Sequence, residues 1–193
     1  MVRFFLGYDP NETVAFYVAA HSIMRHASVP VSITPLKLSQ LPLTRKRDAR
    51  QSTEFSFSRF LVPWLCEYQG TAIFADCDVL VRADIATMRG TPNSAVSVVQ
   101  HDYKPRPEDK FWGQKQTIYD KKNWSSVMLF NNDRCRALTP EYVNRASGLE
   151  LHQFKWLEKA QIGALDPAWN HLVGEYPPNP DAKIAHFTRG TPC

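Results

Sequence analysis

The sequence has no long hydrophobic run. Charged residues interrupt every apolar stretch well before the ~20 residues that a membrane-spanning helix needs. The first apolar stretch, from Met1 to Gly7, is also too short for the apolar region of a signal peptide. The sequence therefore predicts a cytoplasmic protein without a membrane span.

Cysteine and glycine are both scarce, and their spacing excludes several kinds of site. The four cysteines form no Cys-x-x-Cys pair, which argues against a zinc knuckle and a thioredoxin motif. In a chain of this length we expect them to be reduced thiols. The eight glycines form neither a GxGxxG nor a Walker A loop. A GxSxG nucleophile elbow and an HExxH zinc motif are missing as well.

Charge of one sign is not in large excess either. The 23 basic and 19 acidic residues give a net charge of +4, which does not indicate a nucleic-acid partner but suits a small polyanion such as a nucleotide. The hydrophobic content of 44% is enough to fill a core. With 193 residues, the chain has the usual size of one domain, and we expect residues 1–193 to form one.

The N-terminal pattern alternates between strand and helix. Apolar runs at 2–7 and 31–36 predict strands, and a helix capped by Asn11 is expected between them. Its core face is expected to carry residues at helical spacing, namely Val14, Val18, His21, Ile23 and Met24. This order predicts an α/β fold with a mostly parallel central sheet and helices on both faces. Sites in such sheets lie beyond the carboxyl ends of the strands.

The rest of the chain continues this pattern with one long interruption. A fully apolar run at 71–75 predicts a central strand that is buried on both faces. Helices are expected at 56–68, with a kink at Pro63, from Pro140 onward, and at 152–160. Further strands are expected at 95–100, 127–130 and 184–187. The polar segment 101–122 is long for a loop in a compact domain, which makes it a candidate lid.

The strongest local signal is Asp76-Cys77-Asp78, directly after the apolar run at 71–75. Two carboxylates two residues apart oppose each other's ionisation and lose hydration at the end of a buried strand. A divalent cation removes this penalty, and Mg²⁺ is typically held by one or two carboxylates together with substrate phosphates. The sequence therefore predicts a metal site at this strand end.

Two classes of enzyme place an acid pair at such a position. In haloacid-dehalogenase-like phosphatases the first aspartate is a nucleophile, and its motif usually lies near the N-terminus. In nucleotide-sugar glycosyltransferases of the GT-A fold the pair binds the metal of the donor diphosphate, after a nucleotide-binding half-domain. The strand–helix–strand unit before Asp76 favours the second class. The phosphatase and a catalytically inactive nucleotide- or carbohydrate-binding module stay open as alternatives.

Five segments, in their order and spacing, resemble those of the retaining GT-A glycosyltransferase family that contains glycogenin and bacterial lipopolysaccharide galactosyltransferases. Within that family, the chain is similar to a small bacterial or phage branch. They are Phe5-Leu6-Gly7-Tyr8-Asp9, Ser58-Arg59-Phe60, Phe74-Ala75-Asp76-Cys77-Asp78, the segment 123–131, and His186-Phe187-Thr188-Arg189-Gly190. The resemblance implies a hexosyltransferase-like enzyme that uses a nucleotide-diphospho-sugar donor, a UDP-sugar, with retention. A glycan, a lipid-linked glycan and a protein are all possible acceptors, and the oligomeric state is open.

The same resemblance assigns roles to individual residues. It implies Mn²⁺, or Mg²⁺, bound by Asp76, Asp78 and His186. It implies donor contacts from Gly7, Tyr8, Asp9, Arg59, Ser125, Arg189 and Gly190. It places Asp102 and Gln153 beside the donor sugar as the candidate catalytic residues.

The sequence departs from the family pattern at three places. His152 stands where the family has an aspartate before the glutamine, so only Gln153 carries over. Pro192 stands where the family has a lysine, and Arg189 is expected to supply that positive charge to phosphate instead. The sequence ends at Cys193, so the C-terminal part that binds acceptor in the family is expected to be short or absent.

Overall fold

The computed structural model describes residues 1–46, 51, 53–102 and 120–190. Most of the candidate lid at 101–122 therefore lies outside the described residues, as do Pro192 and Cys193. The other three cysteines, Cys66, Cys77 and Cys135, are buried free thiols, as expected. In the described part of the chain, no helix has the length and apolar character needed to cross a membrane.

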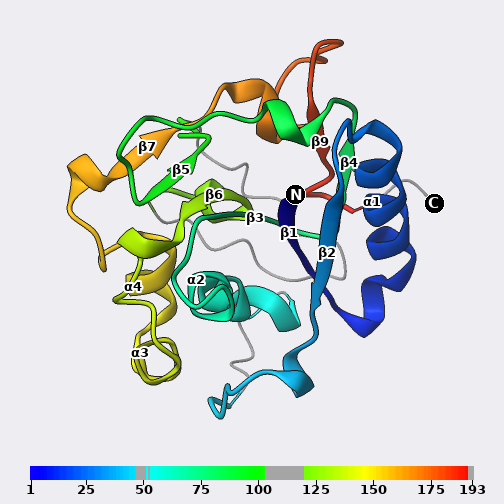
Figure 1. Cartoon of the computed structure of the whole chain (residues 1–193). Coiled ribbons are helices and arrows are strands. Elements are labelled where there is room, and N and C mark those ends of the chain that lie inside the picture. The colour runs from blue at the N-terminus through cyan, green and yellow to red at the C-terminus, as the bar shows by residue number, and fades with distance from the viewer. Residues whose placement is uncertain (47–50, 52, 103–119, 191–193) are drawn as a thin grey trace.

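The strands form two sheets (Figure 1). Six strands in the order β2-β1-β3-β6-β5-β7 form the large sheet, and three in the order β4-β9-β8 form the small one. Their bounds are β1 Val2–Gly7, β2 Val31–Leu36, β3 Thr71–Ala75, β4 Val79–Val81, β5 Val96–Val98, β6 Val127–Asn131, β7 Ile162–Ala164, β8 His171–Leu172 and β9 Ile184–His186. The expected strands are confirmed, whereas β4, β7 and β8, which have two or three residues each, were not predicted.

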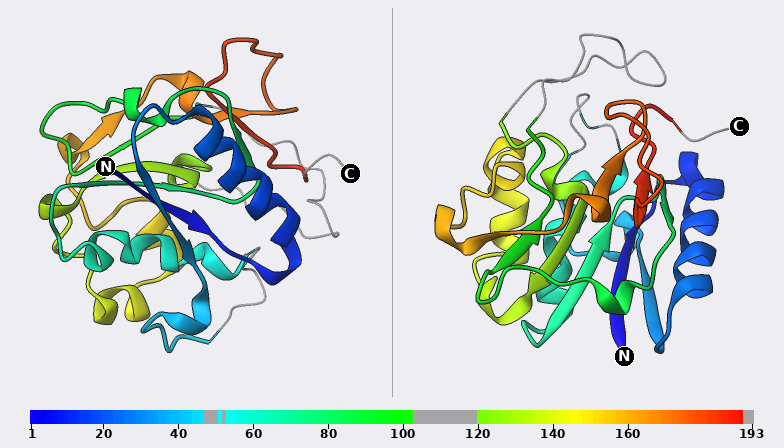
Figure 2. Two further views of the ribbon diagram at one scale, coloured as in Figure 1. Left: turned by 45° about the vertical axis from the view of Figure 1, so that its right-hand side comes forward. Right: turned by 90° about the horizontal axis from the view of Figure 1, so that it is seen from above.

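Helices lie on both sides of the large sheet, as predicted (Figures 1 and 2). The α-helices are α1 Thr13–His26, α2 Val62–Leu65, α3 Pro140–Arg145 and α4 Gly148–His152. Helix α1 packs on β4 and β1, while α2, α3 and α4 are grouped on the other side. The 3₁₀ helices used below are η1 Pro10–Glu12, η4 Ser58–Leu61, η7 Trp124–Ser126 and η10 Pro167–Asn170.

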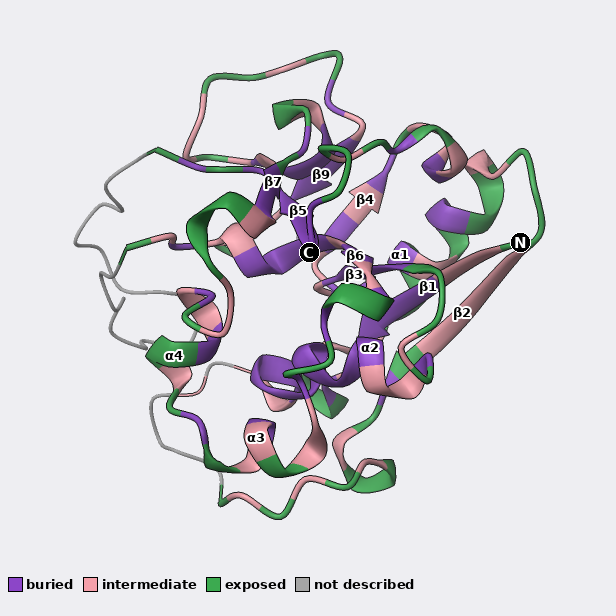
Figure 3. Ribbon diagram, turned by 60° about the vertical axis from the view of Figure 1, so that its left-hand side comes forward, coloured by how far each residue is buried: buried purple, intermediate pink, exposed green. Residues whose placement is uncertain are grey.

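The central sheet is mostly parallel, with β6 running against both of its neighbours. Strand β1 pairs in parallel with β2 and β3, and β5 pairs in parallel with β7. Strand β3 is buried on both faces, as its apolar sequence predicted, and lies in the buried centre of the molecule (Figure 3). Because β6 is antiparallel, its first residue, Val127, lies opposite Ala75, the last residue of β3. The segment before β6 is therefore brought to the edge at which Asp76 emerges.

The predicted core face of α1 is confirmed at Ile23 but wrong at the other positions. Val14, Val18 and Met24 are 78%, 49% and 60% exposed. Instead the helix buries mainly small side chains, and these allow it to lie close to the sheets: Ala15, Phe16, Ala19, Ser22 and Ile23 are the buried residues. Ser22 Oγ even accepts a hydrogen bond from the backbone N–H of Val81 in β4, at 3.0 Å. Large apolar residues occur on both faces of this helix, so periodicity alone selected the wrong one.

Two other predicted helices differ from the observed ones. The segment 56–68 is divided between η4 and the four-residue α2, and Pro63 lies in the first turn of α2 instead of forming a kink. The helix expected at 152–160 is wrong: the preceding helix α4 ends at His152, Phe154 has a φ of 56°, and only a 3₁₀ turn follows at Lys159–Gln161.

The cap predicted at Asn11 is wrong, because Asp9 caps η1 and α1 begins after Glu12 without a side-chain cap. At the start of α3 the Thr139 side chain accepts from the backbone N–H of Tyr142, and Asp84 accepts from that of Ala86.

The corrected face of α1 can be tested with two neighbouring residues. Ile23→Ala removes a side chain that is 0% exposed, and it should lower the free energy of unfolding by about 2–4 kcal/mol. Met24→Ala, at a position that is 60% exposed, should change it by no more than about 0.5 kcal/mol. Urea unfolding of both variants measures the difference, and equal losses would contradict this packing of α1.

Candidate functional site

The acid pair and the distant histidine are brought together by strand pairing. Asp76 follows β3 and Asp78 precedes β4. Strand β9 pairs antiparallel with β4, and its register places His186 opposite Val79. The backbone N–H of Phe187 also donates to the carbonyl of Asp78, at 2.9 Å. The main chain therefore fixes His186 beside the acid pair, from a segment that lies far along the sequence.

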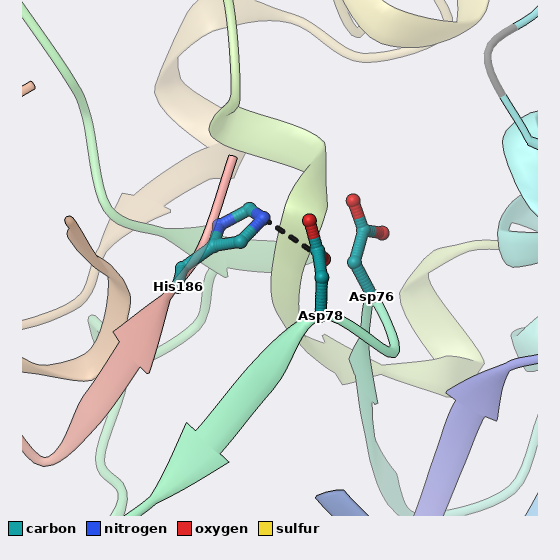
Figure 4. Close-up of side chains that lie close together, drawn as sticks. All are labelled: Asp76, Asp78 and His186. Atoms are coloured by element: carbon teal, nitrogen blue, oxygen red, sulfur yellow. Dashed lines mark ion pairs between the residues drawn. The ribbon is translucent and has the colours of Figure 1, made fainter. Parts of the chain in front are cut away.

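The three side chains point toward one another (Figure 4). One potential ligand atom from each of Asp76, Asp78 and His186 lies within 4.8 Å of the other two. His186 Nε2 is 3.2 Å from Asp78 Oδ1, and the histidine is 2% exposed. Two carboxylate oxygens and one imidazole nitrogen form a donor set that fits a divalent cation, and the imidazole suits Mn²⁺ better than Mg²⁺.

The environment of His186 controls its charge. Burial by itself would lower the pKa of the imidazole, but the Asp78 carboxylate and its hydrogen bond, helped by Asp76, outweigh burial and raise it. A proton on His186 thus offsets part of the negative charge of the acid pair. Since a metal ligand must be a neutral imidazole, a cation bound at this position would displace that proton.

Arg59 lies beneath the acid pair. It is 5% exposed, and its Nη1 is 2.8 Å from Asp76 Oδ1 and donates to the carbonyl of Ser125 at 2.9 Å. Its guanidinium also lies 4.9 Å from the centre of the Phe74 ring. The structure thus brings Arg59 and Ser125 together at the edge where Asp76 emerges. An arginine on a short helix ordinarily forms an exposed ion pair, whereas the ion pair of Arg59 is buried.

Ser125 links this cluster to His152. Its hydroxyl lies 2.7 Å from His152 Nδ1, and the His152 ring makes an edge contact with Phe60. Gln153 follows α4, and its backbone carbonyl accepts from Lys121 Nζ at 2.6 Å. Of this predicted pair of positions, His152 is therefore the one whose side chain contacts Ser125.

Residues at the end of β1 form the next part of the edge. The Asp9 side chain is 2% exposed and accepts hydrogen bonds from the backbone N–H groups of Asn11 and Glu54, at 2.9 and 3.0 Å. In this structure Asp9 therefore caps η1 and ties it to a distant loop. Tyr8 packs edge-to-face on Phe16. Gly7 is required for packing, since a Cβ there would lie 2.6 Å from the Phe55 ring.

The remaining predicted residues lie beyond β9 and β5. Arg189 Nε donates to Glu175 Oε1 at 3.1 Å, and Gly190 adopts a φ of 111°. Asp102 is exposed. Burial is the largest influence on the Tyr176 hydroxyl and raises its pKa, and the Asp102 charge adds to this effect.

Sequence reasoning missed Glu12 as part of this edge. Cys77 Sγ donates to Glu12 Oε2 at 3.0 Å, so the residue between the two aspartates reaches back to η1. Burial, together with the charges of Asp78, Asp9 and Asp76, raises the pKa of Glu12 to about 7. Its place in the first turn of a predicted helix gave no sign of this contact.

Comparison with known proteins identifies a relative in sequence and several structures with a similar fold. No protein-family model matches the chain. It is 45% identical to Protein CDI of Arabidopsis thaliana over 203 aligned residues, which cover 98% of this chain and 78% of that protein.

Two solved structures illustrate the similarity of fold. The apo structure of the bifunctional glycosyltransferase WbbM has a TM-score of 0.64 at 13% identity, over 98% of this chain and 46% of that chain. Mouse xyloside xylosyltransferase 1 in its apo form has a TM-score of 0.58 at 14% identity, over 100% of this chain and 99% of that chain. This chain thus spans less than half the length of WbbM. The likeness confirms the GT-A-like fold that the sequence predicted.

The raised pKa of Glu12 predicts a pH-dependent stability. Between the ordinary value of 4.5 and about 7 the folded state binds more protons than the unfolded state, so stability falls as pH rises through this window. Glu12→Gln removes that dependence and keeps an acceptor for Cys77. In metal-free buffer, its Tm should exceed that of the unmodified protein by roughly 5–10 °C at pH values near 8, and by much less near 5.

Glu67→Gln is a matched control for this measurement, because Glu67 is exposed and precedes β3, whereas the acid pair follows the other end of that strand. Its effect on Tm should be small at both pH values. A gain for Glu12→Gln that stayed constant across the pH window would contradict the assignment.

Proposed function

The chain belongs to the family of Protein CDI, and we propose that it is a metal-dependent glycosyltransferase that transfers a sugar from a nucleotide-diphospho-sugar. The observation that carries this proposal is the convergence of Asp76, Asp78 and His186 within 4.8 Å at the end of the central strand of a GT-A-like fold. Such a donor set is suited to a cation that also meets a diphosphate. A UDP-sugar is the donor class that we favour.

Asp76, Asp78 and His186 would hold the cation, and Mn²⁺ suits their mixed oxygen and nitrogen donors. When bound, a divalent cation supplies Lewis-acid stabilisation of negative charge on a departing diphosphate. Arg59 contributes a fixed positive charge, because its ion pair with Asp76 keeps the guanidinium at this edge. Arg189, oriented by Glu175, would add a second positive charge toward the phosphates.

The other predicted residues complete the proposed donor site. Gly7, Tyr8 and Asp9 would lie along the nucleoside, and Gly190 would let the backbone approach the diphosphate. Ser125, held by Arg59 and His152, would face the sugar together with Asp102 and Gln153. We propose retention at the anomeric carbon, by attack on the same face with a leaving-group phosphate oxygen accepting the acceptor's proton. No residue is assigned as a covalent carboxylate nucleophile.

The phosphatase alternative gains no support from the structure. Asp76, which would be the nucleophile, is in an ion pair with the buried Arg59, whose Nη1 lies 2.8 Å from Asp76 Oδ1, so this oxygen is engaged by the guanidinium. The inactive binding module predicts the same metal-dependent binding as a transferase. Only a measurement of turnover therefore distinguishes the transferase from the inactive binding module.

Thermal denaturation with nucleotide-sugars tests the donor and the metal together. A UDP-sugar at about 100 times its Kd should stabilise the folded protein by about 2.7 kcal/mol in the presence of Mn²⁺, which raises Tm by roughly 5–10 °C. Asp76→Asn combined with Asp78→Asn should remove this shift. Asp133→Asn combined with Asp181→Asn, which removes two exposed carboxylates elsewhere, should retain it.

Release of UDP measured in the same samples decides between transfer and binding. Mn²⁺-dependent UDP release, which the Asp76 and Asp78 double variant abolishes, supports the transferase. A Tm shift without turnover of any nucleotide-sugar would support the inactive module. A Tm shift that is unchanged in the double variant would reject the metal site.

A further inference from the structure

A buried asparagine lies behind the histidine of the candidate metal site. Asn170, the last residue of η10, is 0% exposed, and its Oδ1 lies 2.9 Å from His186 Nδ1. The other ring nitrogen, Nε2, faces Asp78 Oδ1 at 3.2 Å. The imidazole is therefore held between an amide on one side and the acid pair on the other.

The orientation of the Asn170 amide follows from its other partners. Asn170 Nδ2 lies 3.3 Å from the backbone carbonyl oxygen of Asn123 and 2.9 Å from Ser126 Oγ. A carbonyl oxygen can only accept, so the amide group that faces Asn123 must be the NH₂ donor. This leaves the amide oxygen, which can only accept, toward His186. The hydrogen-bond network thus assigns the amide orientation independently of the histidine.

The orientation of the amide determines the tautomer of the histidine. Because Asn170 Oδ1 only accepts, His186 Nδ1 must carry a hydrogen. Asp78 Oδ1 also only accepts, so in the absence of a cation Nε2 carries a hydrogen as well and donates it to the acid pair. A cation at the acid pair would replace the Nε2 hydrogen, while Asn170 retains the one on Nδ1, and this leaves the Nε2 lone pair that a histidine ligand requires. We propose that Asn170 is a positioning residue that holds His186 in the Nδ1-protonated tautomer and presents Nε2 to the cation.

The same network joins the two sides of the site. Ser126 accepts from Asn170 through Oγ, and its backbone carbonyl accepts from the N–H of Asp76 at 2.9 Å. A continuous series of hydrogen bonds therefore runs from the His186 ring through Asn170 and Ser126 to Asp76. Loss of Asn170 would free the ring to change tautomer or rotate, and it would also loosen the segment before β6. Loss of such a supporting partner typically weakens metal binding about 10- to 100-fold.

The first test needs no metal and no substrate. In metal-free protein labelled with ¹⁵N-histidine, the NMR spectrum of His186 should show a hydrogen on Nδ1 that exchanges slowly with water, because Asn170 accepts it. Asn170→Leu should speed this exchange at least about tenfold. An Nδ1 without a hydrogen in the unmodified protein, or one whose hydrogen exchanges as fast as in a free histidine, would overturn the assignment, even if Asn170→Leu does not fold.

Mn²⁺ affinity, measured by calorimetry with Mn²⁺ alone, is the second test, and it rests on the proposed metal site. Asn170→Leu should weaken Mn²⁺ binding about 10- to 100-fold. Asn170→Asp keeps an acceptor for Nδ1 but loses donation to Asn123, so it should lower Tm while Kd stays within about threefold of the unmodified protein. Loss of affinity in both variants alike would show that fold stability, and not the acceptor, matters.

Asn132→Leu is the matched control. Asn132 is also 0% exposed and donates to the carbonyl of Gln69 at 3.0 Å, but it follows β6, at the end of that strand away from the acid pair. This variant should lower Tm without changing the exchange of the His186 Nδ1 hydrogen or the Mn²⁺ affinity. An equal loss of affinity in Asn132→Leu would overturn the proposal. Failure of the unmodified protein to bind Mn²⁺ would contradict the proposed function, while the NMR result would still decide the role of Asn170.

Discussion

The pairing of β9 with β4 is the constraint on which the site depends. It is a short contact, with Val79 opposite His186 and Val81 opposite Ile184, yet it brings the C-terminal part of the chain beside the acid pair. Shifting this register by one residue would turn the imidazole to the other face of the strand and away from Asp78. The small three-stranded sheet thus sets the geometry of the site, while the large sheet supplies the stable edge on which it is built.

Negative charge at this edge is balanced by a few buried groups. Asp76 has Arg59, Asp78 has His186, and the carboxylate of Asp9 is used by two backbone amides. Glu12, which has only the weak donor Cys77 among the contacts described above, has its pKa raised to about 7. A cation bound between Asp76 and Asp78 would relieve the repulsion that these four carboxylates exert on one another. Repulsion among these carboxylates therefore lowers the stability of this edge and, at the same time, favours the binding of a cation in the proposed function.

Prediction from sequence succeeded where one short segment contained the whole signal. The apolar run at 71–75 could only be a strand buried on both faces, and β3 is that strand. It failed where a choice depended on the partner. Helix α1 has apolar residues on two faces, and the face with Ala19 and Ser22 was selected because small side chains fit closely against β4. Asn170 gave no signal at all, since its role depends on contacts with Asn123, Ser126 and His186.

The sequence by itself determined the class of fold and the acid pair, because both depend on local patterns of apolar and charged residues. It also indicated His186 as a third ligand, but only through resemblance. Tertiary structure alone decided that the histidine reaches the acids, that Arg59 is buried beneath them, and that Asn170 orients the ring. The physical reason is that hydrogen-bond direction and buried charge depend on which segments meet in space, and no spacing along one chain specifies that.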